Sequence, residues 1–153
     1  GSQGFLKKDD NKLSRSLDLE IIDKLVDKKE EIFNLFHSRD FSKAIKEIMQ
    51  LADKANQYID FHKPWELNKN DDNSEDVKKI ASTAINLFRI LNLYLEPVIP
   101  ETSEKIKNYL KSNQSLDDLS TNLIDHQIDI FKPLMFRIED AEITKLNEIS
   151  QNG

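Results

Sequence analysis

The chain has 153 residues, of which 33% are charged and 38% hydrophobic, so it is long enough for one domain with a single core. Only three glycines and four prolines occur, which favours an all-α protein over a sheet, and the absence of cysteine excludes disulfides, zinc–thiolate sites and thiol catalysis. The formal charge of −6 argues against coating nucleic acid through bulk electrostatics, but it permits the recognition of a few exposed bases.

Membrane and export signals are missing from the sequence. No apolar stretch approaches the roughly 18 residues of a membrane span, and no signal peptide opens the chain. We therefore expect a cytoplasmic location and no membrane partner. Residues 1–3, Gly-Ser-Gln, include a Gly-Ser pair of the kind that cleavage of an affinity tag leaves behind.

The first helix is predicted from Asp18 to about His37, after an arm at residues 5–16 that has little periodicity. A second helix begins between Asp40 and Ser42, either of which could cap it. The short link between them predicts an antiparallel hairpin. The apolar residues of the first helix recur at helical spacing: Ile21, Ile22, Leu25, Val26, Ile32, Phe33 and Phe36.

The third helix, predicted from about Asp76 to Leu95, is apolar on nearly every side after Ala84, so we expect it to be central and enclosed. A fourth helix opens at Pro100, where proline and a following acid are favoured, and runs to Leu110.

Beyond the fourth helix the pattern weakens. Residues 116–119 predict a single turn, residues 127–138 an extended segment, and residues 140–149 a short terminal helix. The sequence as a whole predicts one domain over residues 1–153: an antiparallel bundle of four main helices plus a short C-terminal helix.

The second helix ends at an aromatic corner. Pro64 cannot continue a helix and pushes Lys63 toward extended geometry, so the helix must stop near His62. The exit turn then presents Trp65, the only tryptophan, beside Lys63 and Lys69. A flat aromatic side chain beside a cation is suited to stacking on an unpaired base. On this segment alone, a tryptophan that plugs the end of the core is the commoner alternative.

Asn56 and Asp60 lie up the same helix and, being four residues apart, share a face. An asparagine amide can hydrogen-bond a base edge, while an aspartate adds an acceptor and repels phosphate. Two other roles are open on spacing alone: a tether between helix and loop for Asn56, and an ion pair with Lys63 for Asp60.

Catalytic signatures are missing. The sequence has no glycine-rich phosphate loop, no G-x-S-x-G, no H-E-x-x-H and no calcium-loop spacing. His37, His62 and His126 are scattered, as surface histidines usually are. We therefore expect no active site, metal or cofactor in this chain, and a role in binding.

Three segments, which follow one another in the same order as in the family, resemble the anticodon-binding domain of methionyl-tRNA synthetases. Residues 44–65 read AIKEIMQLADKANQYIDFHKPW, against a family helix that ends A-N-x-Y-x-D-x-x-x-P-W. Residues 85–105, INLFRILNLYLEPVIPETSEK, match the family's hydrophobic helix, proline break and P-x-T-x-x. Residues 130–139, IFKPLMFRIE, match a segment that ends R-I-D in the family, and Gly4-Phe5 matches its opening Gly-Phe.

The resemblance implies an α-helical bundle that recognises the CAU anticodon loop of methionine tRNAs. By position in the motif, Pro64 and Trp65 match the family's P-W, whose tryptophan stacks on an anticodon base. Lys69 matches a lysine close to bound tRNA. Asp53 and Asp60 match acidic residues that help to exclude wrong tRNAs by repulsion.

Departures from the family pattern limit what the resemblance implies. The asparagine and arginine that read anticodon bases precede the Gly-Phe in the family, and that stretch is missing here or replaced by residues 1–3. The H-I-G-H and K-M-S-K-S signatures are also missing. The resemblance thus implies a non-catalytic part of a methionine–tRNA ligase, whose catalytic domain would bind ATP and methionine and be a partner of this one.

Two alternatives stay open from the sequence. Class I synthetases for isoleucine, valine, leucine and cysteine share a helical anticodon domain, although P-W after A-N-x-Y-x-D favours methionine. The other alternative is a helical protein-interaction bundle with no role in RNA binding, which predicts a large exposed apolar patch.

Overall fold

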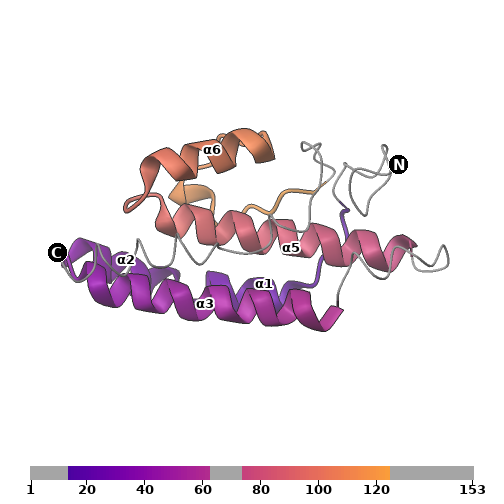
Figure 1. Ribbon diagram of the computed structural model, residues 1–153, viewed down its shortest axis with the longest axis horizontal. Coiled ribbons are helices and arrows are strands. Elements are labelled where there is room, and N and C mark those ends of the chain that lie inside the picture. The colour runs from indigo at the N-terminus through magenta and orange to yellow at the C-terminus, as the bar shows by residue number, and fades with distance from the viewer. Residues whose placement is uncertain (1–13, 63–73, 125–153) are drawn as a thin grey trace.

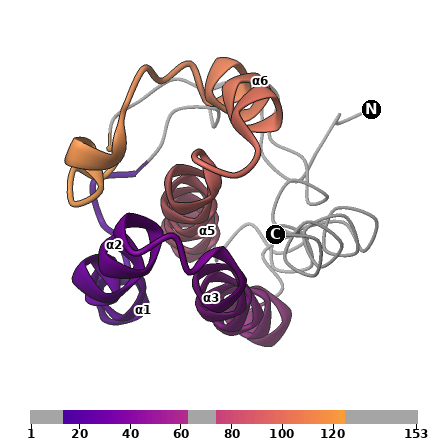
Figure 2. The same cartoon turned by 90° about the vertical axis from the view of Figure 1, so that its left-hand side faces the viewer.

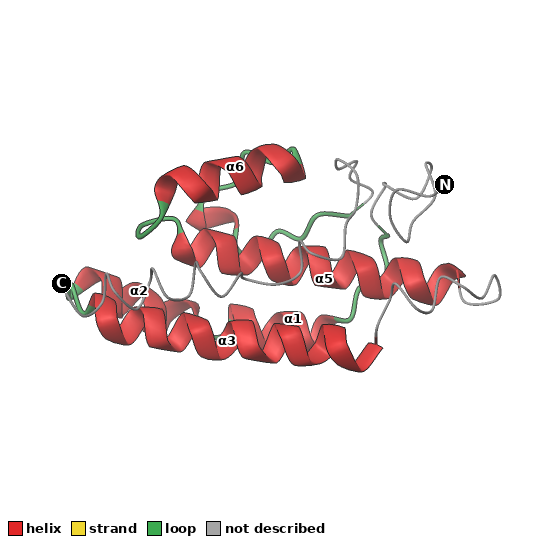
Figure 3. Cartoon of the chain, in the orientation of Figure 1, coloured by secondary structure: helices red, strands yellow, loops and turns green. Residues whose placement is uncertain are grey.

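The computed structural model describes residues 14–62 and 74–124, and every regular element within these two ranges is helical (Figure 3). The all-α prediction is confirmed. Predictions for the arm up to residue 13, the segment 127–138 and the helix 140–149 lie outside the described residues. The elements are α1 Leu19–Val26, α2 Lys29–His37, α3 Phe41–His62, α5 Ser74–Leu95, α6 Pro100–Leu110 and the short 3-10 helix η3 Leu116–Asp118.

Helix α5 lies at the centre of the bundle. Seen end-on, α5 is surrounded by three neighbours: the pair α1 and α2, the helix α3, and the helix α6 (Figure 2). Helices α3 and α6 run antiparallel to α5 (Figure 1). All side chains from Ile80 to Leu95 are buried, as the prediction of an enclosed third helix required. None of the helices described is long and apolar enough to cross a membrane.

The prediction of a single first helix is wrong. The structure has two helices there, because the helical conformation is interrupted at Asp27 and Lys28. The buried face of α1 carries Ile22 and Leu25, and its continuation one turn on would bring Lys28 or Lys29 into the core. Because of the interruption, α2 begins in a new rotational register and buries Ile32 in place of a lysine.

Tyr94 of α5 stabilises this break. A helix end leaves carbonyl groups without intrahelical partners, and the buried Tyr94 hydroxyl donates a hydrogen bond to the Leu25 carbonyl at 2.7 Å. The Val26 carbonyl lies 3.5 Å from the same hydroxyl. Burial raises the pKa of Tyr94, so the phenol keeps the proton that this contact needs.

The turn from α2 to α3 is fixed by its backbone. Arg39 adopts a left-handed conformation with φ of 63°, and the Asp40 amide donates to the Leu35 carbonyl at 2.8 Å, as in a Schellman helix end. The Asp40 carboxylate then accepts a hydrogen bond from the Lys43 amide at 3.3 Å, so Asp40 is the residue that caps α3. The predicted hairpin is confirmed.

A row of buried polar side chains follows α5 and binds segments that are not helical. The Ser82 and Thr83 hydroxyls accept hydrogen bonds from the backbone amides of Ser14 and Asp18, at 2.7 and 2.9 Å. One turn on, Asn86 accepts from the Leu123 amide at 2.7 Å and donates to the Leu123 carbonyl at 3.0 Å. Each polar group is thus satisfied by a different part of the chain.

Arg89 continues this row and is only 1% exposed. Its guanidinium donates to the carbonyls of Asp118 and Leu119 and to three amide side chains, those of Asn86, Gln114 and Asn122, at 2.9–3.3 Å. Burial lowers the pKa of Arg89 to about 10, which still leaves it protonated at neutral pH. A single buried cation therefore binds the segment after α6 at four points between residues 114 and 122.

Replacing Arg89 by methionine should lower the free energy of unfolding by about 3 kcal/mol, because several buried acceptors would lose their donor. Urea denaturation measures the loss. Arg39→Met, at an exposed position, removes the same charge and should change stability by less than about 0.5 kcal/mol. Equal losses in the two variants would contradict this role of Arg89.

Candidate functional site

Three of the predicted site residues, Asp53, Asn56 and Asp60, form one stripe along the C-terminal half of α3. They are spaced three and four residues apart, so they share a face of the helix. Both aspartates are exposed and Asn56 is half-buried. Pro64, Trp65 and Lys69, together with Lys63, lie outside the described residues, so their predicted roles stay predictions.

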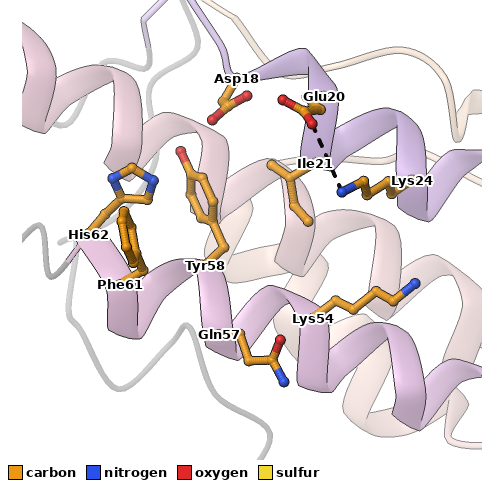
Figure 4. Close-up of a pocket in the computed structure, with 9 residues that line it drawn as sticks. All are labelled: Asp18, Glu20, Ile21, Lys24, Lys54, Gln57, Tyr58, Phe61 and His62. Atoms are coloured by element: carbon orange, nitrogen blue, oxygen red, sulfur yellow. Dashed lines mark ion pairs between the residues drawn. The ribbon is translucent and has the colours of Figure 1, made fainter.

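The adjoining flank of α3 borders a hollow that the sequence reasoning missed. This surface, which we call the α1–α3 hollow, lies between the two helices (Figure 4). The signal that could have found it is the spacing of Lys54, Gln57 and Phe61, which places them on one side of the helix, next to the acidic stripe. Its lining residues are Asp18, Glu20, Ile21, Lys24, Lys54, Gln57, Tyr58, Phe61 and His62.

An aromatic group forms one end of this hollow. The ring centroids of Tyr58 and His62 are 4.5 Å apart, and Phe61 meets His62 edge-on at 5.0 Å. Phe61 is 83% exposed, whereas Tyr58 and His62 are half-buried. The last turn of α3 therefore offers aromatic surface to solvent.

Tyr58 connects this end of α3 to the rest of the bundle. Its ring packs against both hydrophobic clusters of the core, the larger one around α5 and the smaller one that includes Ile59. Burial, the largest cause, raises the pKa of Tyr58 to about 12, and the nearby side chains of Thr83 and Asp18 also affect it. Tyr58 thus packs beside the buried Ala55 and Ile59, which hold this turn of α3 against the core.

Metal binding finds no support in the geometry. Within residues 14–62 and 74–124, no three His, Asp or Glu side chains gather in a way that could hold a metal ion. The arrangement instead offers an acidic stripe on one flank of α3 and aromatic, amide and lysine side chains on the other.

The fold and these surfaces define an all-helical bundle domain whose candidate binding groups lie on one exposed helix. Residues 11–149 match the model of a family described as the anticodon binding domain of methionyl tRNA ligase. The chain belongs to that family.

Curated relatives agree with this assignment. The chain is 40% identical to the methionine–tRNA ligase of Vesicomyosocius okutanii subsp. Calyptogena okutanii (strain HA), with 98% of this chain and 28% of that protein covered. It is 44% identical to the methionine–tRNA ligase of Psychrobacter sp. (strain PRwf-1), with 93% of this chain and 21% of that protein covered. The chain therefore spans about a quarter of the length of these relatives.

The raised pKa of Tyr58 predicts a loss of stability at high pH. The unfolded chain ionises tyrosine near pH 10, while folded Tyr58 holds its proton to about 12, so the folded state binds more protons in between. The contribution of Tyr58 to the free energy of unfolding is fully present below pH 10 and decreases as the pH rises toward 12.

Tyr58→Phe isolates this effect from other titrating groups. Between pH 10 and 12, we expect the free energy of unfolding of the wild type to fall by about 1–2 kcal/mol relative to the variant. This is less than the full pKa shift implies, because the Tyr58 ring is only half-buried. Urea unfolding of both proteins across this pH range measures the difference. Parallel curves would show that the phenol is not held as described.

Proposed function

We propose that this chain is the tRNA-recognition module of a methionine–tRNA ligase and binds the CAU anticodon loop of methionine tRNAs. The observation that carries the proposal is the family match over residues 11–149, which includes the ordered A-N-x-Y-x-D and P-W motif. In this proposal Trp65 stacks on an anticodon base, Pro64 fixes the corner that presents it, and Lys69 binds the loop backbone.

The stripe on α3 would supply selectivity. Asn56 carries both a donor and an acceptor for a base edge, whereas the exposed carboxylates of Asp53 and Asp60 repel any phosphate that a wrong loop brings near. This division explains why a domain with a net charge of −6 can bind RNA: its charge limits non-specific binding and leaves contacts at one local site.

Catalysis would belong to the remainder of a longer parent chain. The relatives named as methionine–tRNA ligases are about four times as long as the region they share with this chain. In the proposal, that remainder binds ATP and methionine and joins methionine to the tRNA that this module selects. We expect no cofactor to bind to this chain itself.

Fluorescence of Trp65 tests the proposal directly, because Trp65 is the only tryptophan. Titration with a CAU stem-loop should quench the emission, and a scrambled loop should not. Trp65→Ala should weaken binding by about 1–3 kcal/mol, the contribution of stacking on one base. A blue-shifted emission that no stem-loop changes would identify Trp65 as a core residue and reject its assignment.

Stem-loops with the anticodons for isoleucine, valine, leucine and cysteine extend the same titration. Preference for one of these would assign the module to a different class I synthetase. Equal binding of every loop, or of none, would leave a protein-interaction bundle as the better account.

Asp60→Asn should relax selectivity more than it changes the affinity for CAU. Without the carboxylate, mismatched loops should bind several-fold more tightly, because a repulsion of about 1 kcal/mol is removed. The measurement is the ratio of dissociation constants for CAU and scrambled stem-loops. Asp117→Asn, at an exposed position of η3, makes the same charge change and should leave that ratio unaltered.

A further inference from the structure

We propose that the α1–α3 hollow is a second RNA contact. It would take one unpaired nucleotide of the same stem-loop, outside the three anticodon bases, with its base on Phe61 and its phosphate on Lys54. The inference rests on the proposed function and adds a site to it. No residue of the acidic stripe lines the hollow, but Gln57, which does, lies one turn from Asp53 and Asp60, so the hollow and the acidic stripe are adjoining surfaces of α3.

The aromatic end of the hollow is built for stacking. Phe61 is 83% exposed, yet its ring is braced by His62 at 5.0 Å, which in turn lies 4.5 Å from Tyr58. An exposed phenyl ring that neighbouring rings already orient loses little conformational entropy when a base covers it. Aromatic side chains in such positions stack on any base, because every base has a π-face.

The other end of the hollow is cationic. Lys54 lies seven residues before Phe61, about 10 Å along the helix axis. Figure 4 shows Lys54 and Lys24 on the side of the hollow away from the aromatic rings, Lys24 facing Glu20 and Lys54 on the α3 wall. Lys24 is paired with Glu20 at 4.0 Å, whereas Lys54 forms no ion pair with the residues that the structure describes. Lys54 is therefore the cation available to a phosphate.

The carboxylates of the hollow limit how RNA can lie in it. Asp18 and Glu20 line the α1 side, and Asp18 lies near the side chain of Tyr58. A phosphate placed between the two ends would meet these negative charges, so a continuous strand along the hollow is disfavoured. A single nucleotide with its phosphate on Lys54 lies on the α3 side of the hollow, away from Asp18 and Glu20 (Figure 4).

Two observations favour RNA over a protein partner. The centres of protein interfaces are depleted in Lys, Asp and Glu, yet four such side chains line this hollow: Asp18, Glu20, Lys24 and Lys54. In addition, Phe61 and His62 directly precede Lys63, Pro64 and Trp65 in the chain. A helix is only about 10–12 Å wide, so a loop bound at the end of α3 can reach both flanks.

Titration of a labelled CAU stem-loop against Phe61→Leu and Lys54→Gln tests the inference. Phe61→Leu should weaken binding about 5- to 150-fold, the fold-change equivalent of losing one stacked base, and should keep the CAU preference because stacking tolerates any base. Lys54→Gln should reduce the slope of log affinity against log salt by about 0.7, the loss of one phosphate contact to a single strand.

The chain offers matched controls for both variants. Phe41→Leu removes another exposed phenylalanine, 41% exposed at the far end of α3, and Lys105→Gln removes an exposed cation on α6. Neither should change affinity or salt slope. Urea unfolding of all four variants should match the wild type closely. If Phe61→Leu proves unstable, the salt slope of Lys54→Gln by itself tests whether the hollow contacts RNA.

The possible failures are distinguishable. If the wild type prefers CAU but Phe61→Leu and Lys54→Gln bind as it does, the hollow is not an RNA contact and the proposed function stands. If Phe61→Leu alters the discrimination between CAU and scrambled loops, the ring reads an anticodon base and the assignment to a flanking nucleotide is wrong. If the wild type binds no stem-loop selectively, both proposals fail.

Discussion

The bundle depends on a row of buried polar side chains along its central helix. Ser82, Thr83, Asn86 and Arg89 of α5 are almost completely excluded from solvent, and each holds a segment from elsewhere in the chain. Buried polar groups are costly unless they are paired, and here the pairing fixes where the non-helical segments must lie. Apolar packing alone would bury the same helices with far less control over these connections.

The partners of this row come from both ends of the described chain. The backbone at Ser14 and Asp18 binds to the first half of α5, and the backbone at Leu119 and Leu123 binds further along. The contacts of α5 therefore fix the backbone near residue 14 and near residue 123, close to the two ends of the described residues.

Helix α3 separates two kinds of surface on one rigid element. Its buried face packs on α5, its acidic stripe carries Asp53, Asn56 and Asp60, and its other flank carries Lys54 and Phe61. Rigid presentation matters for selectivity, because repulsion discriminates only when the wrong ligand cannot shift to avoid it. Tyr58 contributes to this rigidity near the end of the helix, since it contacts both hydrophobic clusters.

Periodicity and proline placement were enough to predict the helices α3, α5 and α6 and the central position of α5, because these depend on local spacing and on burial that the apolar residues require. The face shared by Asn56 and Asp60 followed from helical geometry alone, and the motif at residues 44–65 indicated the family. The break between α1 and α2 was not predicted, and the contact that stabilises it, from the Tyr94 hydroxyl to the Leu25 carbonyl, joins residues 69 apart in the chain. The α1–α3 hollow also required the tertiary structure, since its two walls come from separate helices. Local pattern determined the elements, and the partners brought together across the bundle decided where they end and which surfaces face each other.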